Sequence, residues 1–437
     1  MQNNVFGTER ISKLLLRLAP PIMFSQLIQA MYNIIDSYFV GQYSTEGLAA
    51  LSVLFPIQLL ISSLAVGTGV GVNTLMSRYY GEGREKKADT AAGVGFFLSL
   101  LSWVIFAAVF CGLMLPYSKM SLTSAVAQNY AFHYGMIVCG GSIGIFLESN
   151  WTKVLQARGD MKTPMIAQIT GAVLNIILDY VFIFGVGFVP RMGVDGAAIA
   201  TVIGQITAAV IVGTKAFCKI PKSEKKTYIK AIYKAGIPNI LMNATCTIYI
   251  VALNLILKKF SDDAVTVLGL YYKLQMFYLI PVLGLETCIV PMLSYNYAAK
   301  KYERCKKILS ESLLISAICM LMGTALFEAI PSQLIEIFAK NEPDIVTIGT
   351  YALRVIAISF VPIAPSLMMP TFFQAIGKGK ESVFLSLLRQ LFLLIPVSWG
   401  LSFLGLKAVW WAFPITEIIT AAMGLILYFA ERRKMNI

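Results

Sequence analysis

The chain has 437 residues, of which 57% are hydrophobic and only 14% are charged, whereas about 25% of the residues in a typical soluble domain are charged. This composition excludes an ordinary soluble protein and indicates a membrane protein. The net charge of +13 alone would suit a nucleic-acid-binding protein, but the placement of the basic residues favours a membrane protein instead, so we expect no nucleic acid partner.

Apolar stretches recur along the whole chain, each long enough to cross a hydrocarbon core of about 30 Å as a helix. We predict six spans in the first half, over residues 13–40, 51–77, 91–115, 131–155, 165–187 and 195–216. Six more follow over residues 235–257, 267–296, 308–331, 347–373, 383–404 and 408–430. The predicted fold is therefore an all-α polytopic membrane protein with twelve transmembrane helices.

The basic residues indicate the orientation of these spans. If the N-terminus is cytoplasmic, the inner segments carry 27 of the 36 Lys and Arg residues, as the positive-inside rule requires. The first span contains Gln26, Gln29 and Asp36 and is too long and too polar for a signal peptide. We expect a multi-pass protein of the bacterial cytoplasmic (inner) membrane, surrounded by lipid, with both termini cytoplasmic.

An internal repeat appears when the chain is compared with itself after a shift of half its length. At a single common offset the coinciding residues are Pro21 with Pro238, Tyr32 with Tyr249, Gly67 with Gly284, Ser77 with Ser294 and Tyr80 with Tyr297. Each half has an even number of spans, so the two halves run in the same sense, as in transporters with parallel repeats. The repeat predicts two six-helix lobes, residues 1–217 and 235–437, joined by a basic cytoplasmic linker, residues 218–234.

Two carboxylates are predicted at similar depth in the first lobe. Counted along the helix from the nearest cytoplasmic basic residue, Asp36 lies about 28 Å and Asp179 about 25 Å into the membrane. Asn33 and Asn175 lie three and four residues before these acids, on the same helix faces. A carboxylate at such depth costs at least about 2.5 kcal/mol and by default indicates function.

A polar chamber of this kind has two possible uses. It can bind a proton, because burial and a second nearby carboxylate both favour the neutral form of a carboxyl group. It can equally offer oxygen ligands to Na⁺ at Asp36, Asp179 and Asn175. A third interpretation is that Asp36 is a hydrated structural residue near the outer interface. The second lobe does not repeat these acids, since Leu253 stands opposite Asp36.

Other polar and small residues within spans have structural interpretations. Arg389 and Glu417, at about 13 Å and about 22 Å from the inner side, differ too much in depth to form an ideal ion pair. The glycines of G-T-G-V-G (Gly67 to Gly71), and Gly140 with Gly144, have the small-x-x-x-small spacing of helix contacts.

Enzyme signatures are missing from the sequence. No G-x-x-x-x-G-K-[ST] motif is present to bind ATP phosphates, and a single histidine excludes a His-rich metal site. We expect no enzymatic activity and no cofactor, so energy must come from an ion gradient of H⁺ or Na⁺.

Several segments resemble the multidrug and toxic compound extrusion (MATE) family, of the MOP superfamily, in its MepA-like bacterial branch. They are M-Y-N-I-I-D-S-Y-F-V-G from Met31, Q-A-R-G-D-M-K-T-P from Gln156, L-N-I-I-L-D-Y-V-F-I-F from Leu174, G-L-Y-Y-K-L-Q-M-F from Gly269 and P-V-L-G-L-E-T-C-I-V-P-M-L-S-Y-N-Y-A-A from Pro281. The resemblance covers essentially the whole chain.

The resemblance implies a cleft between two lobes and export of bulky hydrophobic cations by alternating access, coupled to inward H⁺ or Na⁺. It implies that Asp36, Asp179 and Asn175 bind the coupling ion, and we add Asn33 to them. We expect the substrate cleft to include Glu286, Glu148, Tyr32 and Gln275, and the protein to be a monomer. The alternative is a lipid or lipid-linked oligosaccharide flippase of the same superfamily.

Overall fold

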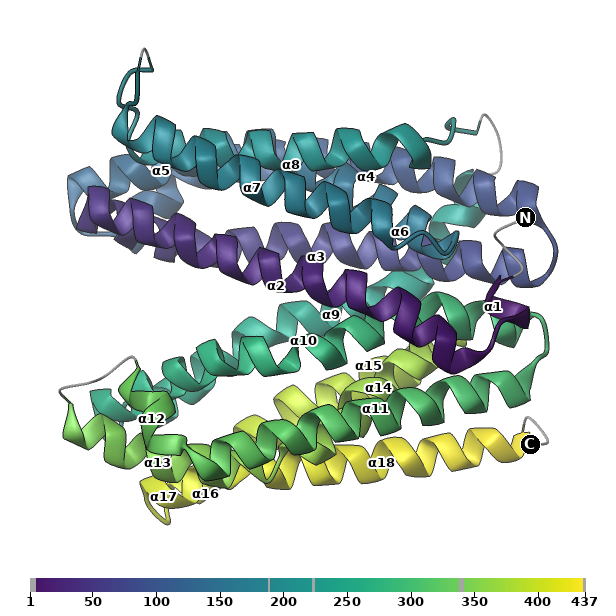
Figure 1. Cartoon of the computed structure of the whole chain (residues 1–437). Helices are drawn as coiled ribbons and strands as arrows, with labels where there is room; N and C mark the ends of the chain where they lie inside the picture. The colour runs from purple at the N-terminus through teal and green to yellow at the C-terminus, as the bar shows by residue number, and fades with distance from the viewer. Residues whose placement is uncertain (1–4, 188, 222–224, 338–341, 435–437) are drawn as a thin grey trace. The chain divides into compact units, whose positions relative to one another are not determined.

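The computed structural model describes residues 5–187, 189–221, 225–337 and 342–434. These residues are almost entirely helical, and no strand occurs among them. Three residues of the predicted linker, 222–224, lie outside the described residues. Figure 1 shows long helices that lie side by side within each part of the chain.

The first half contains α1 (Val5–Thr8), α2 (Ile11–Tyr43), α3 (Thr45–Gly81), α4 (Glu85–Ser121), α5 (Ala125–Gly141), α6 (Ile143–Ala157), α7 (Lys162–Phe184) and α8 (Val194–Ala216). The second half begins with α9 (Lys225–Leu257), α10 (Asp262–Ala298), α11 (Tyr302–Ala329), α12 (Pro331–Glu336), α13 (Pro343–Ala357) and α14 (Phe360–Ala375). It ends with α15 (Gly379–Leu387), the π-helical turn η2 (Leu388–Leu394), α16 (Ile395–Ser402), α17 (Leu406–Val409) and α18 (Ala412–Lys434).

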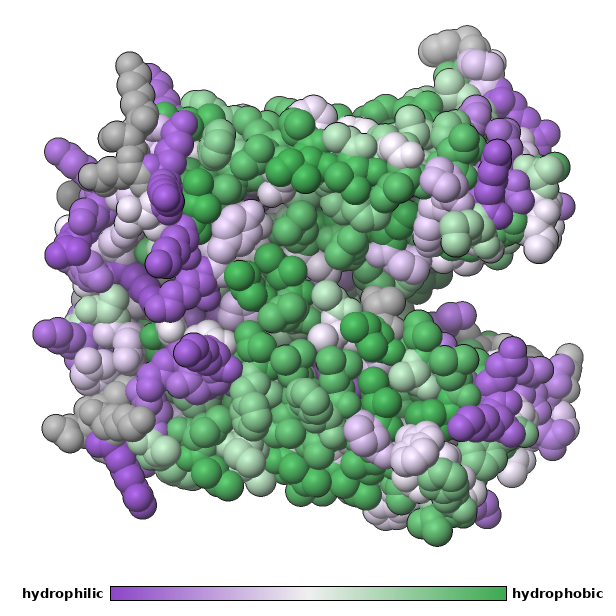
Figure 2. Space-filling view, turned by 180° about the vertical axis from the view of Figure 1, so that it is seen from behind, coloured by the Kyte–Doolittle hydropathy of each residue, from purple (hydrophilic) through white to green (hydrophobic). Residues whose placement is uncertain are grey.

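Ten of these helices, taking α15 to α16 as one span and α17 to α18 as another, are long and apolar enough to cross a membrane among the described residues. The number rises to twelve if each of two bent pairs, α5 with α6 and α13 with α14, forms one span. Figure 2 shows hydrophobic side chains along the middle of the helices and hydrophilic ones near their ends. This is the surface expected of a protein surrounded by lipid.

The two bent pairs break at equivalent positions of the repeat. The bend is 40° at Ser142 and 55° near Ser359, and these serines have the same offset in the sequence as Pro21 and Pro238. Each hydroxyl donates to a backbone carbonyl three residues earlier, Ser142 Oγ to Cys139 O at 2.7 Å and Ser359 Oγ to Ile356 O at 2.5 Å. The side chains thus add a donor to carbonyls at the bends, and the predicted fourth and tenth spans are bent helix pairs rather than single straight helices.

Serines also begin several of the long helices. Ser44 Oγ accepts from Gly47 N at 3.1 Å at the start of α3, and Ser261 Oγ accepts from Ala264 N at 3.1 Å at the start of α10. An N-terminal cap of this kind satisfies a backbone N–H that the first helical turn leaves unpaired. Ser44 and Ser261 are related by the same offset in the sequence, so the repeat extends to the helix starts.

The described chain divides into two units. Unit 1 comprises residues 1–5 and 20–240, and unit 2 comprises residues 6–19 and 241–437. The division falls within α2 and α9, whereas the sequence places it in a linker at residues 218–234. The beginning of α9 belongs to unit 1 because it packs tightly against α3.

Glycines of α3 allow this close packing in unit 1. A Cβ atom added to Gly67 would lie 2.2 Å from Ile240 Cγ1, and one added to Gly71 would lie 2.2 Å from the backbone oxygen of Ile232. The predicted helix contact at these glycines is confirmed. Gly144 packs in the same way, since a Cβ atom added to it would lie 2.8 Å from Ile206 N of α8. The predicted close contact at Gly140 is wrong, because nothing lies within 4 Å of a Cβ added there.

Candidate functional site

The two predicted carboxylates come together inside unit 1. Asp179 of α7 is completely buried, and the Asp36 carboxyl of α2 is close enough to interact with it electrostatically. One oxygen of Asp36, Oδ1, is buried and has no hydrogen-bond partner in the part of the chain that the structure describes. The sequence placed these acids at similar depth, and the structure brings them into one cluster.

Asn175 connects Asp179 to α8. In the amide orientation that satisfies both ends of the side chain, its nitrogen donates to Asp179 Oδ2 at 3.2 Å and its oxygen accepts from the backbone N–H of Thr201 at 3.1 Å. The Thr201 hydroxyl also lies 3.5 Å from the Asn175 amide. Asn175 reaches Asp179 because residues four apart lie on the same face of a helix.

Asn33 does not join this cluster. Its side chain is exposed on unit 1, and its backbone oxygen accepts from Ser37 Oγ at 3.0 Å. Because the side chain of Asn33 is exposed, it does not lie on the side of α2 on which Asp36 meets Asp179.

The acids of this region have no basic partner in a salt bridge within the part of the chain that the structure describes. Among the described residues, none of the salt bridges involves Asp36, Asp179 or Glu148. Lys153 is near Glu148, but its Nζ donates to Gln156 Oε1 at 3.0 Å. Because an ionised carboxylate buried without a partner is very costly, these positions suit a carboxyl that takes up a proton or a small cation.

A polar cavity lies next to the cluster in unit 1. The space open to the centres of water molecules is about 80 Å³, and a single water needs about 10–15 Å³ by this measure. The cavity therefore has room for several waters. The polar residues of its wall are Gln29, Tyr32, Glu148, Gln168, Asn175, Thr201 and Gln205.

Glu148 supplies the carboxylate of the cavity wall. Thr152 Oγ1 and Gln168 Nε2 both donate to its Oε1, at 2.8 and 3.1 Å. The neutral donors hold the side chain in place without neutralising its charge. Tyr32, on α2, lies close enough to interact electrostatically with Glu148, Asp36 and Asp179, so two of the four predicted substrate contacts lie in this region of unit 1.

The other two predicted substrate contacts lie in unit 2. Glu286 of α10 accepts a hydrogen bond from the buried hydroxyl of Thr371 on α14. Gln275, also on α10, lines a separate small cavity whose wall includes Tyr249, Tyr272 and Arg389.

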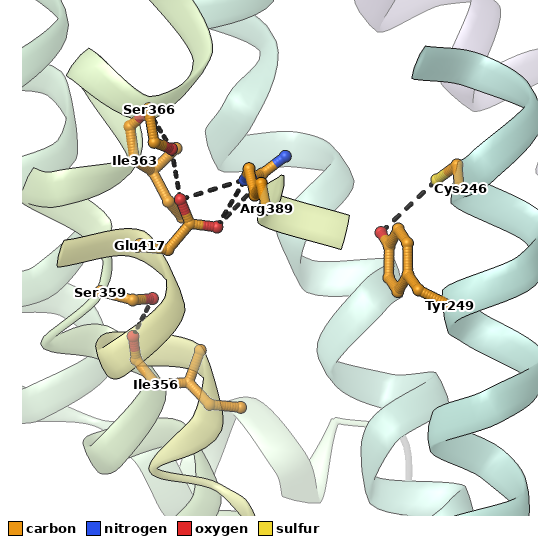
Figure 3. Close-up of polar contacts among 8 residues, drawn as sticks. All are labelled: Cys246, Tyr249, Ile356, Ser359, Ile363, Ser366, Arg389 and Glu417. Carbon is orange, nitrogen blue, oxygen red and sulfur yellow. Dashed lines mark hydrogen bonds and ion pairs between the residues drawn. The ribbon is translucent and has the colours of Figure 1, made fainter. Parts of the chain in front are cut away.

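Arg389 and Glu417 form a buried ion pair in unit 2, so the prediction that their depths differ too much for an ideal pair is wrong. Arg389 Nε lies 2.8 Å and Nη2 lies 2.7 Å from Glu417 Oε1, and Ser366 donates to the same carboxylate. Figure 3 shows both donors reaching Glu417. Counting depth to backbone positions failed because the long Arg side chain extends well beyond its own helix.

Sequence reasoning missed three uncharged residues of the unit 1 site. Thr201 contacts Asn175, Gln168 donates to Glu148, and Tyr134 accepts from Gln58 Nε2 at 3.2 Å beside the two aspartates. Each is a single neutral polar residue in an apolar span. Only their position within a membrane helix distinguished them, and a hydroxyl or amide there is also common in ordinary helix packing.

Comparison with known proteins agrees with this architecture. The profile of the MatE family matches residues 21–181 and again residues 238–399. The two matches begin at Pro21 and Pro238, the first pair of coinciding residues in the repeat, which confirms the internal repeat. Together the two matches cover more than half of the chain.

Curated relatives match over nearly the full length. The chain is 25% identical over 435 residues to a FAD transporter of Shewanella oneidensis, covering 97% of this chain and 95% of the relative. It is 24% identical over 445 residues to the multidrug export protein MepA of Staphylococcus haemolyticus, covering 99% and 96% respectively.

Solved structures show the same fold. A crystal structure of MATE in complex with MaL6 matches with a TM-score of 0.93 and 24% identity, covering 99% of both chains. An outward-facing conformation of a multidrug resistance MATE family transporter matches with the same TM-score and identity, covering 100% of this chain and 98% of the other. This chain belongs to the MatE (MATE) family of multi-pass membrane transporters.

Proposed function

We propose that this MATE transporter is a cation-coupled antiporter that exports bulky hydrophobic cations by alternating access. The observation that carries the proposal is the buried cluster of Asp36, Asp179 and Asn175 in unit 1, which has no basic partner among the described residues. A membrane protein bears the cost of burying such acids where they serve function.

The coupling ion would bind at the two aspartates. Each carboxylate can take up a proton or contribute oxygen ligands to Na⁺, and the Asn175 amide nitrogen donates to Asp179. Entry of one positive charge down 100 mV supplies about 2.3 kcal/mol, which equals the cost of exporting a substrate with one positive charge against the same potential. A second ion per cycle would supply about 2.3 kcal/mol more, which corresponds to a nearly 50-fold concentration ratio of the substrate.

The substrate contacts follow from the same region. Glu148 offers a negative charge and Tyr32 an aromatic ring to the unit 1 cavity, and a carboxylate beside an aromatic face attracts organic cations. In unit 2 we assign Glu286 and Gln275 to substrate contact, as the sequence predicts. The positive-inside pattern supports placement in the bacterial cytoplasmic membrane with both termini inside.

The test is transport by the purified full chain in liposomes loaded with ethidium, with a pH gradient or a Na⁺ gradient imposed separately. We expect one of the two gradients to drive ethidium transport. Asp36→Asn and Asp179→Asn should each lower the driven rate at least about tenfold, because the amide cannot take up the ion. Asp195→Asn is the matched control, since Asp195 pairs with the exposed His133 at 3.4 Å and should retain the native rate.

Transport by Asp179→Asn at the native rate, with the same dependence on the gradient, would refute the coupling assignment. Movement of lipid without movement of ethidium would instead favour the flippase alternative.

A second candidate substrate class is flavin nucleotides, because the chain resembles a FAD transporter over 97% of its length. The acids around the unit 1 cavity favour cations over an anionic dinucleotide, so we rank this class second. FAD-loaded liposomes under the same gradients distinguish the two classes.

A further inference from the structure

Unit 2 contains a small polar cavity that the proposed ion coupling does not use. Its wall includes Arg389 and Gln390 from η2, Glu417 from α18, and Tyr249 and Tyr272 from α9 and α10. The space open to the centres of water molecules is about 20 Å³, which is enough for one or two waters. A π-helical turn places two consecutive polar side chains, Arg389 and Gln390, on this wall, and such turns are frequent at functional sites.

The hydrogen-bond acceptors around this cavity are already occupied. Glu417 receives Arg389 Nε at 2.8 Å, Arg389 Nη2 at 2.7 Å and the Ser366 hydroxyl. Gln390 Oε1 receives the Thr245 hydroxyl. The carboxylate and the amide oxygen therefore have partners within the protein.

Some hydrogen-bond donors around the cavity, in contrast, have no acceptor among the described residues. Arg389 uses Nε and Nη2 on Glu417, and no hydrogen bond of its Nη1 is found among the described residues. Figure 3 shows one guanidinium nitrogen pointing away from Glu417, toward the side on which Tyr249 lies. Gln390 Nε2 is likewise left to donate, and the Tyr272 hydroxyl has no partner in the described part of the chain.

The cavity wall combines polar side chains with aromatic rings. Glu417 and Gln390 are 6% and 7% exposed, and Arg389, Tyr249 and Tyr272 are half-buried. Tyr249 and Tyr272 have their ring centroids 6.3 Å apart. The wall therefore presents hydrogen-bond donors next to aromatic rings.

We propose that this cavity binds the acceptor group, a carboxylate or a carbonyl, of aromatic molecules. The acceptor would displace water and receive hydrogen bonds from Arg389 Nη1 and Gln390 Nε2, while the ring would lie against Tyr249 and Tyr272. Glu417 does not repel the ligand strongly, because the positive charge of the Arg389 guanidinium offsets the charge of its carboxylate and one guanidinium nitrogen points away from Glu417 (Figure 3). Charge-assisted hydrogen bonds from guanidinium to carboxylate are among the strongest in proteins.

The subsite rests on contacts within unit 2 and holds whether or not transport is coupled to an ion.

The test compares two dyes that differ in one group. Tetramethylrhodamine carries a free carboxylate, and its methyl ester does not. Binding of each dye to the full-length protein in nanodiscs is measured by fluorescence anisotropy without any ion gradient. We expect the native protein to bind the acid more tightly than the ester.

Two variants examine the donors. Tyr272→Phe removes one hydroxyl and should weaken binding of the acid about 3- to 10-fold, with little change for the ester. Tyr278→Phe is the matched control, because its hydroxyl is also buried without a partner among the described residues but the ring stacks on Phe360 at 4.1 Å, outside the cavity wall. It should bind both dyes as the native protein does.

The double variant Arg389→Gln with Glu417→Gln removes the guanidinium without leaving a lone buried charge. It should abolish the preference for the acid, a loss of about 10- to 100-fold. An acid-to-ester ratio that is unchanged in both Tyr272→Phe and the double variant, or a native protein that binds the acid no better than the ester, would overturn the proposal. Failure of gradient-driven ethidium transport contradicts the proposed function and leaves this binding result unaffected.

Discussion

Replacement of Gly71 by alanine should separate α3 from α9 and destabilise unit 1. The added Cβ would lie 2.2 Å from the backbone oxygen of Ile232, whereas ordinary contact begins at 3.4 Å. One of the two helices must therefore move by about 1.2 Å, the difference between these two distances. A backbone carbonyl in a helix cannot rotate away as a side chain can, so the movement involves the whole helix.

The displacement also disturbs the next turn of the same contact. Gly67 and Gly236 face each other there, and a Cβ on Gly236 would lie only 2.4 Å from Gly67 O, so these backbones touch directly. Overpacking of this kind costs about 1–3 kcal/mol. Alanine is favoured over glycine inside a helix by up to about 1 kcal/mol, which offsets part of the loss.

Gly140→Ala provides the matched control, because it gives the same helix preference and its Cβ meets nothing within 4 Å. The midpoint of thermal unfolding in detergent, followed by circular dichroism, should be at least about 3 °C lower for Gly71→Ala than for Gly140→Ala. Equal midpoints, or a higher midpoint for Gly71→Ala, would refute the close contact between α3 and α9.

Two further predictions concern unit 2 and the end of α8. Arg389→Gln alone, or Glu417→Gln alone, should lower the free energy of unfolding by about 3–5 kcal/mol, because each variant leaves one buried charge unpaired. The double variant should lower it by less than either single variant. If thermal unfolding showed that the double variant loses the sum of the two single losses, the two residues would not interact. Burial raises the pKa of the Cys218 thiol, and the neighbouring Arg158 guanidinium offsets only part of this, so the thiol stays neutral to a higher pH than a free cysteine. In a variant with Cys218 as its only cysteine, the rate of maleimide labelling at neutral pH should be lower than that of free cysteine and should increase with pH. Arg158→Ala should lower this rate further. A labelling rate equal to that of free cysteine would contradict the burial of the thiol.

The sequence predicted the large-scale organisation well because that organisation depends on repeated, long-range patterns. Hydropathy located the spans, and the offset of the internal repeat recurs in the helix breaks at Ser142 and Ser359 and in both matches to the family profile. Hydropathy could not reveal the breaks themselves, since it measures only how apolar a segment is, and both halves of each bent pair are apolar. The spans therefore had the correct position and an incorrect shape.

The candidate site was predictable where charge was involved and much less so elsewhere. Asp36 and Asp179 are conspicuous in apolar helices, and helix geometry correctly joined Asn175 to Asp179. Thr201 carried no comparable signal, because a threonine within an apolar span is common. The Arg389–Glu417 pair was missed because depth was counted to backbone positions, whereas the long Arg389 side chain reaches well beyond its own helix.

The π-helical turn η2 acts as a one-residue insertion within a single membrane span. Each residue of an α-helix advances the side chains by about 100°, so an added residue rotates everything after it by that amount while hardly changing the length of the span. α15 and α16 thus belong to one continuous segment but present faces that are out of phase. Deletion of one residue between Leu388 and Leu394 would preserve the hydropathy of the segment and still turn α16 away from its present contacts with α18.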